Sequence, residues 1–192
     1  MVQETDQSAR PRPSRLLELY RETIVPTMMK EFRLKNRLAV PRVEKIVVNM
    51  GVKEGAVDIK ILEHLAHELA QITGQKPVVT RAKKSISSFK LRQGAAIGLK
   101  VTLRRARMYE FMDRLFNVAM PRIRDFRGFL VSSFDSSANY SLGVQEQFIF
   151  PEVEYEKMRK IQGMDITFVT TTDKKEESKR LLELFGFPFR RN

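Results

Sequence analysis

Residues 76–107, KPVVTRAKKSISSFKLRQGAAIGLKVTLRRAR, decide the fold, because they indicate two short strands joined by a long basic loop. No Asp or Glu occurs between Leu69 and Tyr109, and the whole chain has a net charge of +12. Most of that charge comes from Lys76, Arg81, Lys83, Lys84, Lys90, Arg92, Lys100, Arg104, Arg105 and Arg107. A basic surface without a partner usually has acidic residues interspersed, so this region is typical of a surface that binds a polyanion.

Alternation marks the second of these strands, residues 98–104, whereas residues 77–80 are predicted to form the first. The inward set is Leu99, Val101 and Leu103, and the outward set is Lys100, Thr102 and Arg104. The connection, residues 81–96, has no strong helix or strand pattern. A loop of that length inside a compact domain is usually functional or disordered.

The segment VEKIVVNMG, residues 43–51, alternates in the same way. Its inward set is Ile46, Val48 and Met50, and its outward set is Lys45, Val47 and Asn49. Residues 59–73 carry an apolar stripe at helical spacing, and Gly74 follows where a left-handed cap ends a helix.

The rest of the chain completes a layered pattern of helices and strands. Helices are predicted at residues 14–32, 109–120 and 155–162 and after Asp173, and strands at residues 142–150 and 166–172. This order predicts a single-domain α+β fold with one mainly antiparallel sheet, helices packed on one face and an opposite face that binds RNA. We expect a flexible tail at residues 1–13 and one RNA-binding domain at residues 14–192, with the basic loop at about 81–96.

No catalytic arrangement emerges from the sequence. The chain has no Cys and two His, no Ser in a nucleophile-elbow context and no phosphate-binding glycine loop followed by Lys-Ser or Lys-Thr. His64, His67 and Glu68 have a spacing that can hold a metal, but an exposed helix face is the simpler interpretation because no further His or Cys completes the site. We therefore expect neither an enzyme nor a metal or other cofactor.

No apolar run approaches the length of a membrane span, and the first residues lack the apolar core of a signal peptide. A basic protein that binds a membrane surface usually carries its charge on an amphipathic helix, whereas here it lies on strand and loop sequence. We expect an intracellular protein with no membrane partner.

The predicted exposed strand faces carry Asn, Lys, Thr and Arg but no aromatic residue for stacking bases. Such a face suits the phosphates, 2′-hydroxyls and base edges of a folded RNA better than a single strand. Duplex DNA is less favoured, because no predicted helix has the basic face needed in a major groove. Two alternatives remain at this point: an RNA-dependent enzyme with acidic metal ligands, and a nucleic-acid chaperone without a defined site.

Seven segments, in order, resemble those of the bacterial large-subunit ribosomal proteins of the L-five family. They are VPRVEKIVVNMGV, ITGQKP, TRAKKSISSFKLRQGAAIGLKVTLRR, PRIRDFRG, NYSLGVQEQFIFPE, GMDITFVTTT and LLELFGFPFR. The resemblance covers nearly everything after the tail. It implies a cytoplasmic protein of the large ribosomal subunit that binds 5S rRNA and helps to form the central protuberance.

The resemblance also implies partners and site residues. The partners are 5S rRNA, large-subunit rRNA, the peptidyl-site tRNA, neighbouring ribosomal proteins of the central protuberance and a small-subunit head protein across an inter-subunit bridge. The 5S rRNA contacts fall on Asn49, Gln75, Lys100, Thr102 and Arg104. The tRNA contacts fall on the loop residues Arg81, Lys83, Lys84, Ser85, Ser87, Lys90 and Arg92.

The inter-subunit contact falls on Arg122, Arg124 and Arg127 of PRIRDFRG and on the loop that follows. In that loop the chain departs from the family pattern. The family commonly has a Gly-Arg-Gly-Asn run, whereas this chain has Ser136, Ser137, Ala138 and Asn139.

Overall fold

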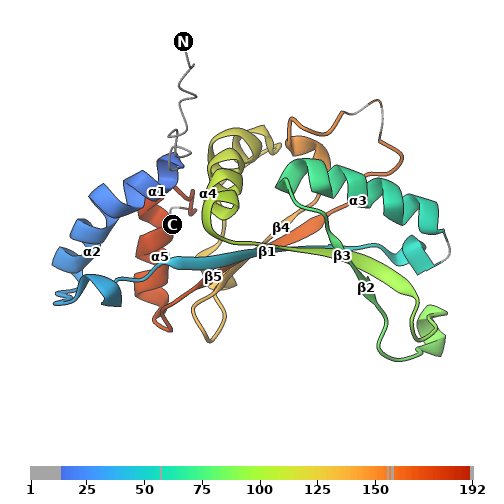
Figure 1. Ribbon diagram of the computed structural model, residues 1–192, viewed down its shortest axis with the longest axis horizontal. Coiled ribbons are helices and arrows are strands. Elements are labelled where there is room, and N and C mark those ends of the chain that lie inside the picture. The colour runs from blue at the N-terminus through green and yellow to red at the C-terminus, as the bar shows by residue number, and fades with distance from the viewer. Residues whose placement is uncertain (1–13, 57, 155, 157, 191–192) are drawn as a thin grey trace, which may run out of the picture.

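The computed structural model describes residues 14–190, apart from residues 57, 155 and 157 (Figure 1). The tail predicted at residues 1–13 lies outside the described residues.

One open antiparallel sheet forms the centre of the molecule, with strand order β2-β3-β1-β5-β4. The strands are β1 (Val43–Gly51), β2 (Val78–Arg81), β3 (Ala96–Leu103), β4 (Tyr140–Val144) and β5 (Met164–Thr170). The α+β class and the antiparallel sheet predicted from the sequence are confirmed. The stretch that decided the prediction forms β2 and β3 at one edge, and β3 pairs with the central strand β1.

Helices α3 and α4 lie side by side on the same side of the sheet (Figure 1). The longer helical segments are α1 (Arg15–Leu19), η1 (Tyr20–Ile24), α2 (Val25–Glu31), α3 (Ile59–Thr73), α4 (Arg105–Arg114), η5 (Leu115–Ala119) and α5 (Lys175–Leu184). The short 3₁₀ turns are η2 (Arg37–Ala39), η3 (Lys53–Ala56), η4 (Ser87–Phe89), η6 (Met120–Arg122), η7 (Val131–Ser133) and η8 (Gln147–Ile149).

The core lies between these helices and the inward side chains of the sheet. Ile46 and Val48 of β1, Leu99 of β3 and Leu69 of α3 are fully buried. Each is apolar, so their removal from water favours the folded state. This packing fixes which side of β1 and β3 faces the core, because a strand places successive side chains on opposite faces.

The N-terminal helical run is continuous from Arg15 to Glu31, but it passes through the π-helical turn η1 directly before Pro26. Proline has no backbone N–H to donate, so a local change of helical pitch before it is physically reasonable. The helix thus changes its type just before Pro26 and does not end there.

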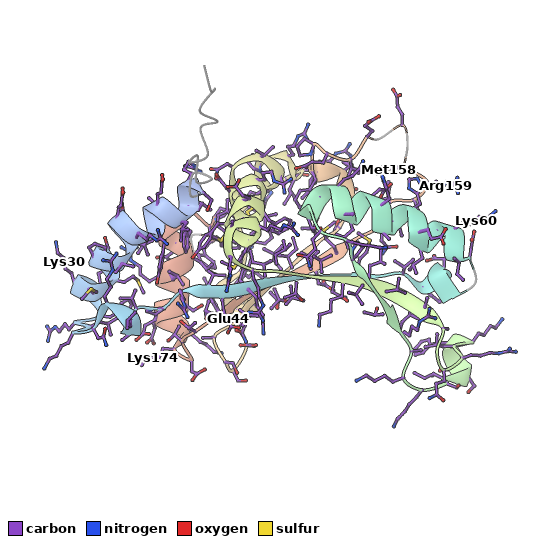
Figure 2. The ribbon with its side chains drawn as sticks, viewed as in Figure 1. Lys30, Glu44, Lys60, Met158, Arg159 and Lys174 are labelled. Atoms are coloured by element: carbon purple, nitrogen blue, oxygen red, sulfur yellow. The ribbon has the colours of Figure 1, made fainter. Side chains whose placement is uncertain are left out.

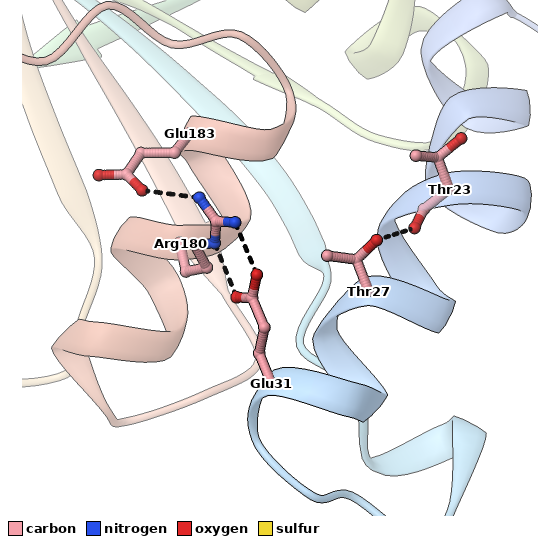
Figure 3. Close-up of polar contacts among 5 residues, drawn as sticks. All are labelled: Thr23, Thr27, Glu31, Arg180 and Glu183. Atoms are coloured by element: carbon pink, nitrogen blue, oxygen red, sulfur yellow. Dashed lines mark hydrogen bonds and ion pairs between the residues drawn. The ribbon is translucent and has the colours of Figure 1, made fainter.

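Arg180 joins this run to the C-terminal helix (Figure 3). Its Nε and Nη2 donate to the two carboxylate oxygens of Glu31 at 2.7 and 2.6 Å, and its Nη1 donates to Glu183 at 3.3 Å. The bidentate bond raises the pKa of Arg180 and lowers that of Glu31. The pair fixes the end of α2 against α5.

Two predicted elements differ in the structure. The strand predicted at residues 142–150 ends at Val144, and η8 follows. Residues 158–162 of the predicted helix are irregular, whereas Tyr155 and Lys157 lie outside the described residues. The buried Gln147 side chain bonds to this irregular segment: it donates to the Lys160 carbonyl at 2.6 Å and accepts from the Gln162 N–H at 2.6 Å. These bonds give the two backbone groups partners without a helix.

Candidate nucleic-acid interface

A polar row crosses the face of the sheet opposite α3 and α4. Lys100 of β3 pairs with Asn49 of β1, and Asn49 pairs on its other side with Asp165 of β5. All three are exposed. In the next row Thr102, which is partly exposed, pairs with Val47. The outward positions predicted from alternation therefore share one surface, which we call the polar sheet face.

Gln75 lies next to β3, just after the end of α3. Gly74 takes a left-handed conformation with φ 67°, which ends the helix and turns the chain toward the sheet. The Gln75 side-chain amide then donates to the backbone carbonyl of Thr102 at 3.3 Å. This bond holds Gln75 beside Thr102, although the two residues are far apart in sequence.

Arg104, the last predicted residue of the face, is ion-paired. Its guanidinium donates to Glu44 at 2.9 Å, and both side chains are about half exposed (51% and 44%). The hydrogen bond from Arg104 lowers the pKa of Glu44 below its usual value. Glu44 lies at an irregularity of the β1–β5 pairing and on the side of the sheet away from α4 (Figure 2). An RNA phosphate that binds Arg104 must compete with this carboxylate.

The face also includes residues that the sequence prediction did not name. Thr167 of β5 pairs with Val47, and its hydroxyl lies 2.9 Å from that of Ser141 on β4. Asp165 contributes a negative charge to the same face. Alternation within the predicted strand at residues 166–172 contained the signal for Thr167, but not the strand order that places it beside β1.

The basic loop is an ordered hairpin rather than an irregular segment. Ile86 and Leu91 exchange two backbone hydrogen bonds, of 2.9 and 3.0 Å, around the η4 turn. At the base, the N–H of Ala82 donates to the Ala95 carbonyl and that of Gly94 to the Ala82 carbonyl, each at 2.9 Å. Figure 1 shows this hairpin, residues 81–96, projecting from the end of β2 and β3. We call it the basic hairpin.

The predicted tRNA-contacting residues all lie on the basic hairpin, but they differ in role. Two of them support the hairpin: Arg81 donates to the Gly94 carbonyl at 3.0 Å, and the Ser85 hydroxyl accepts from the Gln93 N–H at 2.9 Å. All seven are exposed, and no side-chain bond within the hairpin is described for the other five. They are Lys83, Lys84, Ser87, Lys90 and Arg92.

The three arginines predicted at the inter-subunit contact are exposed, and apolar neighbours hold their segment in place. Phe126 and Phe129 pack edge to face with ring centres 5.1 Å apart. The backbone of Phe129 is paired with the C-terminal segment at Pro188 and Arg190, at 3.0 and 2.9 Å. The exposed residues are Arg122, Arg124 and Arg127.

The loop that departs from the family pattern is organised by Asp135. Its carboxylate accepts from the N–H groups of Ser137 and Asn139 at 2.9 and 2.8 Å, and from the Asn139 amide at 2.9 Å. The bond from the Asn139 side chain is the main cause that lowers the pKa of Asp135. Ala138 has φ 54°, a left-handed conformation that Gly adopts more readily. The turn forms without the Gly-Arg-Gly residues.

Glu68 of the possible metal triad has a structural partner. The residue is 4% exposed, and its carboxylate accepts a hydrogen bond from the Gln147 amide at 3.2 Å while lying 3.7 Å from the His64 ring. Within the described residues no group of three or more His, Cys, Asp or Glu side chains is placed to hold a metal ion. Over the same residues, no helix has the length and apolar character required to span a membrane.

Comparison with known proteins matches nearly the whole chain. A model of ribosomal protein L5 matches residues 36–92, and a model of the C-terminus of the same ribosomal protein family matches residues 96–189. The chain is 57% identical over 177 residues to large ribosomal subunit protein uL5 of Geotalea uraniireducens, which covers 92% of this chain and 99% of that protein.

Two further relatives carry the same name. The protein from Caldanaerobacter subterraneus subsp. tengcongensis is 57% identical over 176 residues, covering 92% of this chain and 98% of its own length. That from Thermotoga maritima is 56% identical over 176 residues, covering 92% and 96%.

Proposed function

The chain belongs to the ribosomal protein L5 family and is a ribosomal protein of the large subunit rather than an enzyme; within that subunit, we propose that it binds 5S rRNA and helps to form the central protuberance. Its place is the cytoplasm, where large subunits of this bacterial type work. Its further partners under this proposal are large-subunit rRNA and the neighbouring proteins of the central protuberance.

The polar sheet face is the observation that carries the 5S rRNA proposal. It offers the Asn49 amide, the Lys100 ammonium and the Thr102 hydroxyl on a surface fixed by paired strands. A rigid surface loses little conformational entropy on binding. Its donors fit the phosphates, 2′-hydroxyls and base edges that a folded RNA displays.

The test is the affinity of the full chain for 5S rRNA at fixed salt. The variant Asn49→Ala with Lys100→Ala removes two exposed neighbours and should weaken binding by roughly 10-fold or more, because it removes one phosphate contact and one polar contact. Lys60→Ala is the matched control, since Lys60 is exposed at the outer end of α3 (Figure 2).

Unchanged affinity of the double variant would remove the polar sheet face from the proposal. Equal affinity of the wild-type chain for 5S rRNA and for an unrelated folded RNA of similar length would instead indicate a nucleic-acid chaperone without a defined site.

The basic hairpin is proposed to contact the peptidyl-site tRNA. The hairpin projects from the end of β2 and β3 (Figure 1), and its cations are exposed, so they can reach an RNA other than the one on the polar sheet face. Neutralising Lys83, Lys84 and Lys90 to Ala should leave 5S rRNA affinity within about 2-fold and accelerate tRNA dissociation from assembled ribosomes. Loss of 5S rRNA binding, with normal tRNA retention, would show that the hairpin binds 5S rRNA rather than tRNA.

The exposed arginines at Arg122, Arg124 and Arg127 are proposed to contribute to a bridge with a small-subunit head protein. Large subunits that carry Arg124→Ala and Arg127→Ala should associate more weakly with small subunits at limiting magnesium. Association at the wild-type level would exclude these two side chains from the bridge.

A further inference from the structure

An apolar groove lies between the tip of the basic hairpin and the turn after β1. Phe89 and Leu91 form one side, Val52 and Gly51 the other, and Ile97 also lines it. Its volume is about 640 Å³, within the range of sites that hold a small organic group. The cations Lys53 and Lys90 and the acid Glu54 complete its lining.

Phe89 is unusual in this protein because its ring faces solvent. It is 66% exposed, whereas every other Phe and Tyr among the described residues is buried or half-buried. The remaining described phenylalanines are buried or half-buried, and most pack ring to ring in the core. An exposed ring on a basic surface is the usual platform on which a protein stacks a nucleobase.

The hairpin holds this ring at the groove. Phe89 is the last residue of the η4 turn, and Lys90 follows with φ 52°, a left-handed conformation that reverses the chain. The paired backbones of Ile86 and Leu91 close the turn, and the Lys90 N–H donates to the Ser87 carbonyl at 3.0 Å. The ring is thus carried by a hydrogen-bonded tip rather than by a free chain.

The charge around the groove favours an anionic occupant. Lys53 and Lys90 are both exposed at its rim. Glu54 is the one acidic residue among those that line the groove, and Lys160 pairs with it at 2.5 Å. An occupant with an apolar planar part and flanking negative charges matches both the lining and the rim.

We propose that this groove binds an unpaired nucleobase of RNA, stacked on Phe89, with the adjoining phosphates beside Lys53 and Lys90. The inference rests on the proposed role of the basic hairpin as an RNA contact and adds a base-binding site to it. The cations hold the backbone of the strand, and the ring contributes affinity that requires a base.

The test separates the base from the phosphates. The probes are an oligouridylate strand of about twelve nucleotides and an abasic strand of the same length and charge, within the site sizes of single-strand binders. The full-length wild-type chain should bind the abasic strand about 5- to 150-fold more weakly, the range expected for one stacked base. Phe89→Leu should abolish this preference, and Phe89→Tyr should keep it.

Leu130→Ala is the matched control, because Leu130 is an exposed apolar residue outside the groove. It should retain the wild-type preference for the base-bearing strand. Thermal unfolding of each variant checks folding, which the exposed position of Phe89 should leave unchanged.

The remaining outcomes distinguish this site from the hairpin's proposed function. If the Lys83, Lys84 and Lys90 variant weakens binding of both strands while Phe89→Leu changes neither, the hairpin binds RNA but the groove holds no base. Equal binding of both strands by the wild-type chain would also show that the groove holds no base. That result is expected if the groove takes an apolar protein segment instead. If neither strand binds at low salt, both proposals fail.

Discussion

Arg104 is exposed on the polar sheet face, yet its guanidinium is already bonded to Glu44 at 2.9 Å. The same carboxylate lies 4.0 Å from the Lys45 ammonium. One acidic residue thus lowers the positive potential of two cations next to the proposed 5S rRNA surface. The pair stabilises the free protein little at such exposure, so its main effect is expected on binding.

Glu44→Gln should therefore strengthen 5S rRNA binding. The amide no longer holds Arg104 by charge, so the guanidinium becomes available to a phosphate. The affinity should rise several-fold. The slope of log K against log salt should become steeper by about one, because one more counterion is released when the RNA binds. Titration of the labelled RNA at several salt concentrations measures both quantities.

Glu31→Gln provides the control, because it makes the same charge change in the pair with Arg180 that joins α2 to α5 (Figure 3), and neither residue belongs to the polar sheet face. It should leave the affinity near the wild-type value. An equal increase in both variants would mean that net charge alone is responsible, and weaker binding of Glu44→Gln would show that the carboxylate positions Arg104 for the RNA.

At the scale of the element, the loop at residues 135–139 tests whether local hydrogen bonds replace the family's glycines. Asp135 has a lowered pKa, so its carboxylate stabilises the fold at neutral pH. That contribution is complete above the ordinary Asp pKa of about 3.9. It is lost as the pH falls through the pKa of Asp135 in the folded protein, which is lower.

Asp135→Ala should reduce the free energy of unfolding by roughly 1 kcal/mol at pH 7, because the N–H groups of Ser137 and Asn139 lose their acceptor. The difference from the wild-type chain should shrink below a pH of about 4, where the carboxylate becomes protonated. Denaturant unfolding across this range measures it. Ser136→Ala, in the same exposed loop, should have no such effect, and a pH-independent difference for Asp135→Ala would contradict the charge-based explanation.

The same scale shows what the sequence predicts and what it leaves open. The faces of β1 and β3 followed from alternation, because which side of a strand is buried depends on a local period of two residues. The ordered conformation of the basic hairpin could not be predicted in this way. Ile86 and Leu91 pair through backbone groups, which have no sequence signature. The irregular path of residues 158–162 could not be predicted either, since that segment bonds to the buried Gln147 some distance away in sequence.

The candidate site divides in a similar way. Asn49, Lys100 and Thr102 could be assigned to one exposed face from their strands alone, but the Arg104–Glu44 pair joins positions 60 residues apart and needed the strand register. The groove beside Phe89 depends on how the hairpin packs near Val52, which is a tertiary feature. Sequence patterns located the residues, and only the structure showed their partners.

For the whole molecule, β3 links the two proposed RNA contacts. Its C-terminal half contributes Lys100 and Thr102 to the polar sheet face, and its N-terminal end continues from the basic hairpin. Gly98 lies between them, where a Cβ would come within 2.7 Å of the Met50 carbonyl, so β1 and β3 approach closely at this point. The shared strand holds the two surfaces in a fixed relation while leaving their side chains separate.

Separate surfaces predict separate protection of lysines from acetylation. When 5S rRNA binds the full chain, the reactivity of Lys100 should fall several-fold, whereas that of Lys83, Lys84 and Lys90 should stay near the free value, because phosphates shield only amines that they contact. Adding tRNA to the peptidyl site of large subunits that lack it should then protect the three hairpin lysines without changing Lys100. Mass spectrometry quantifies each site, with Lys60 as the exposed internal reference. Protection of the hairpin lysines by 5S rRNA alone would show that one RNA covers both surfaces, and the assignment of two partners would then be wrong.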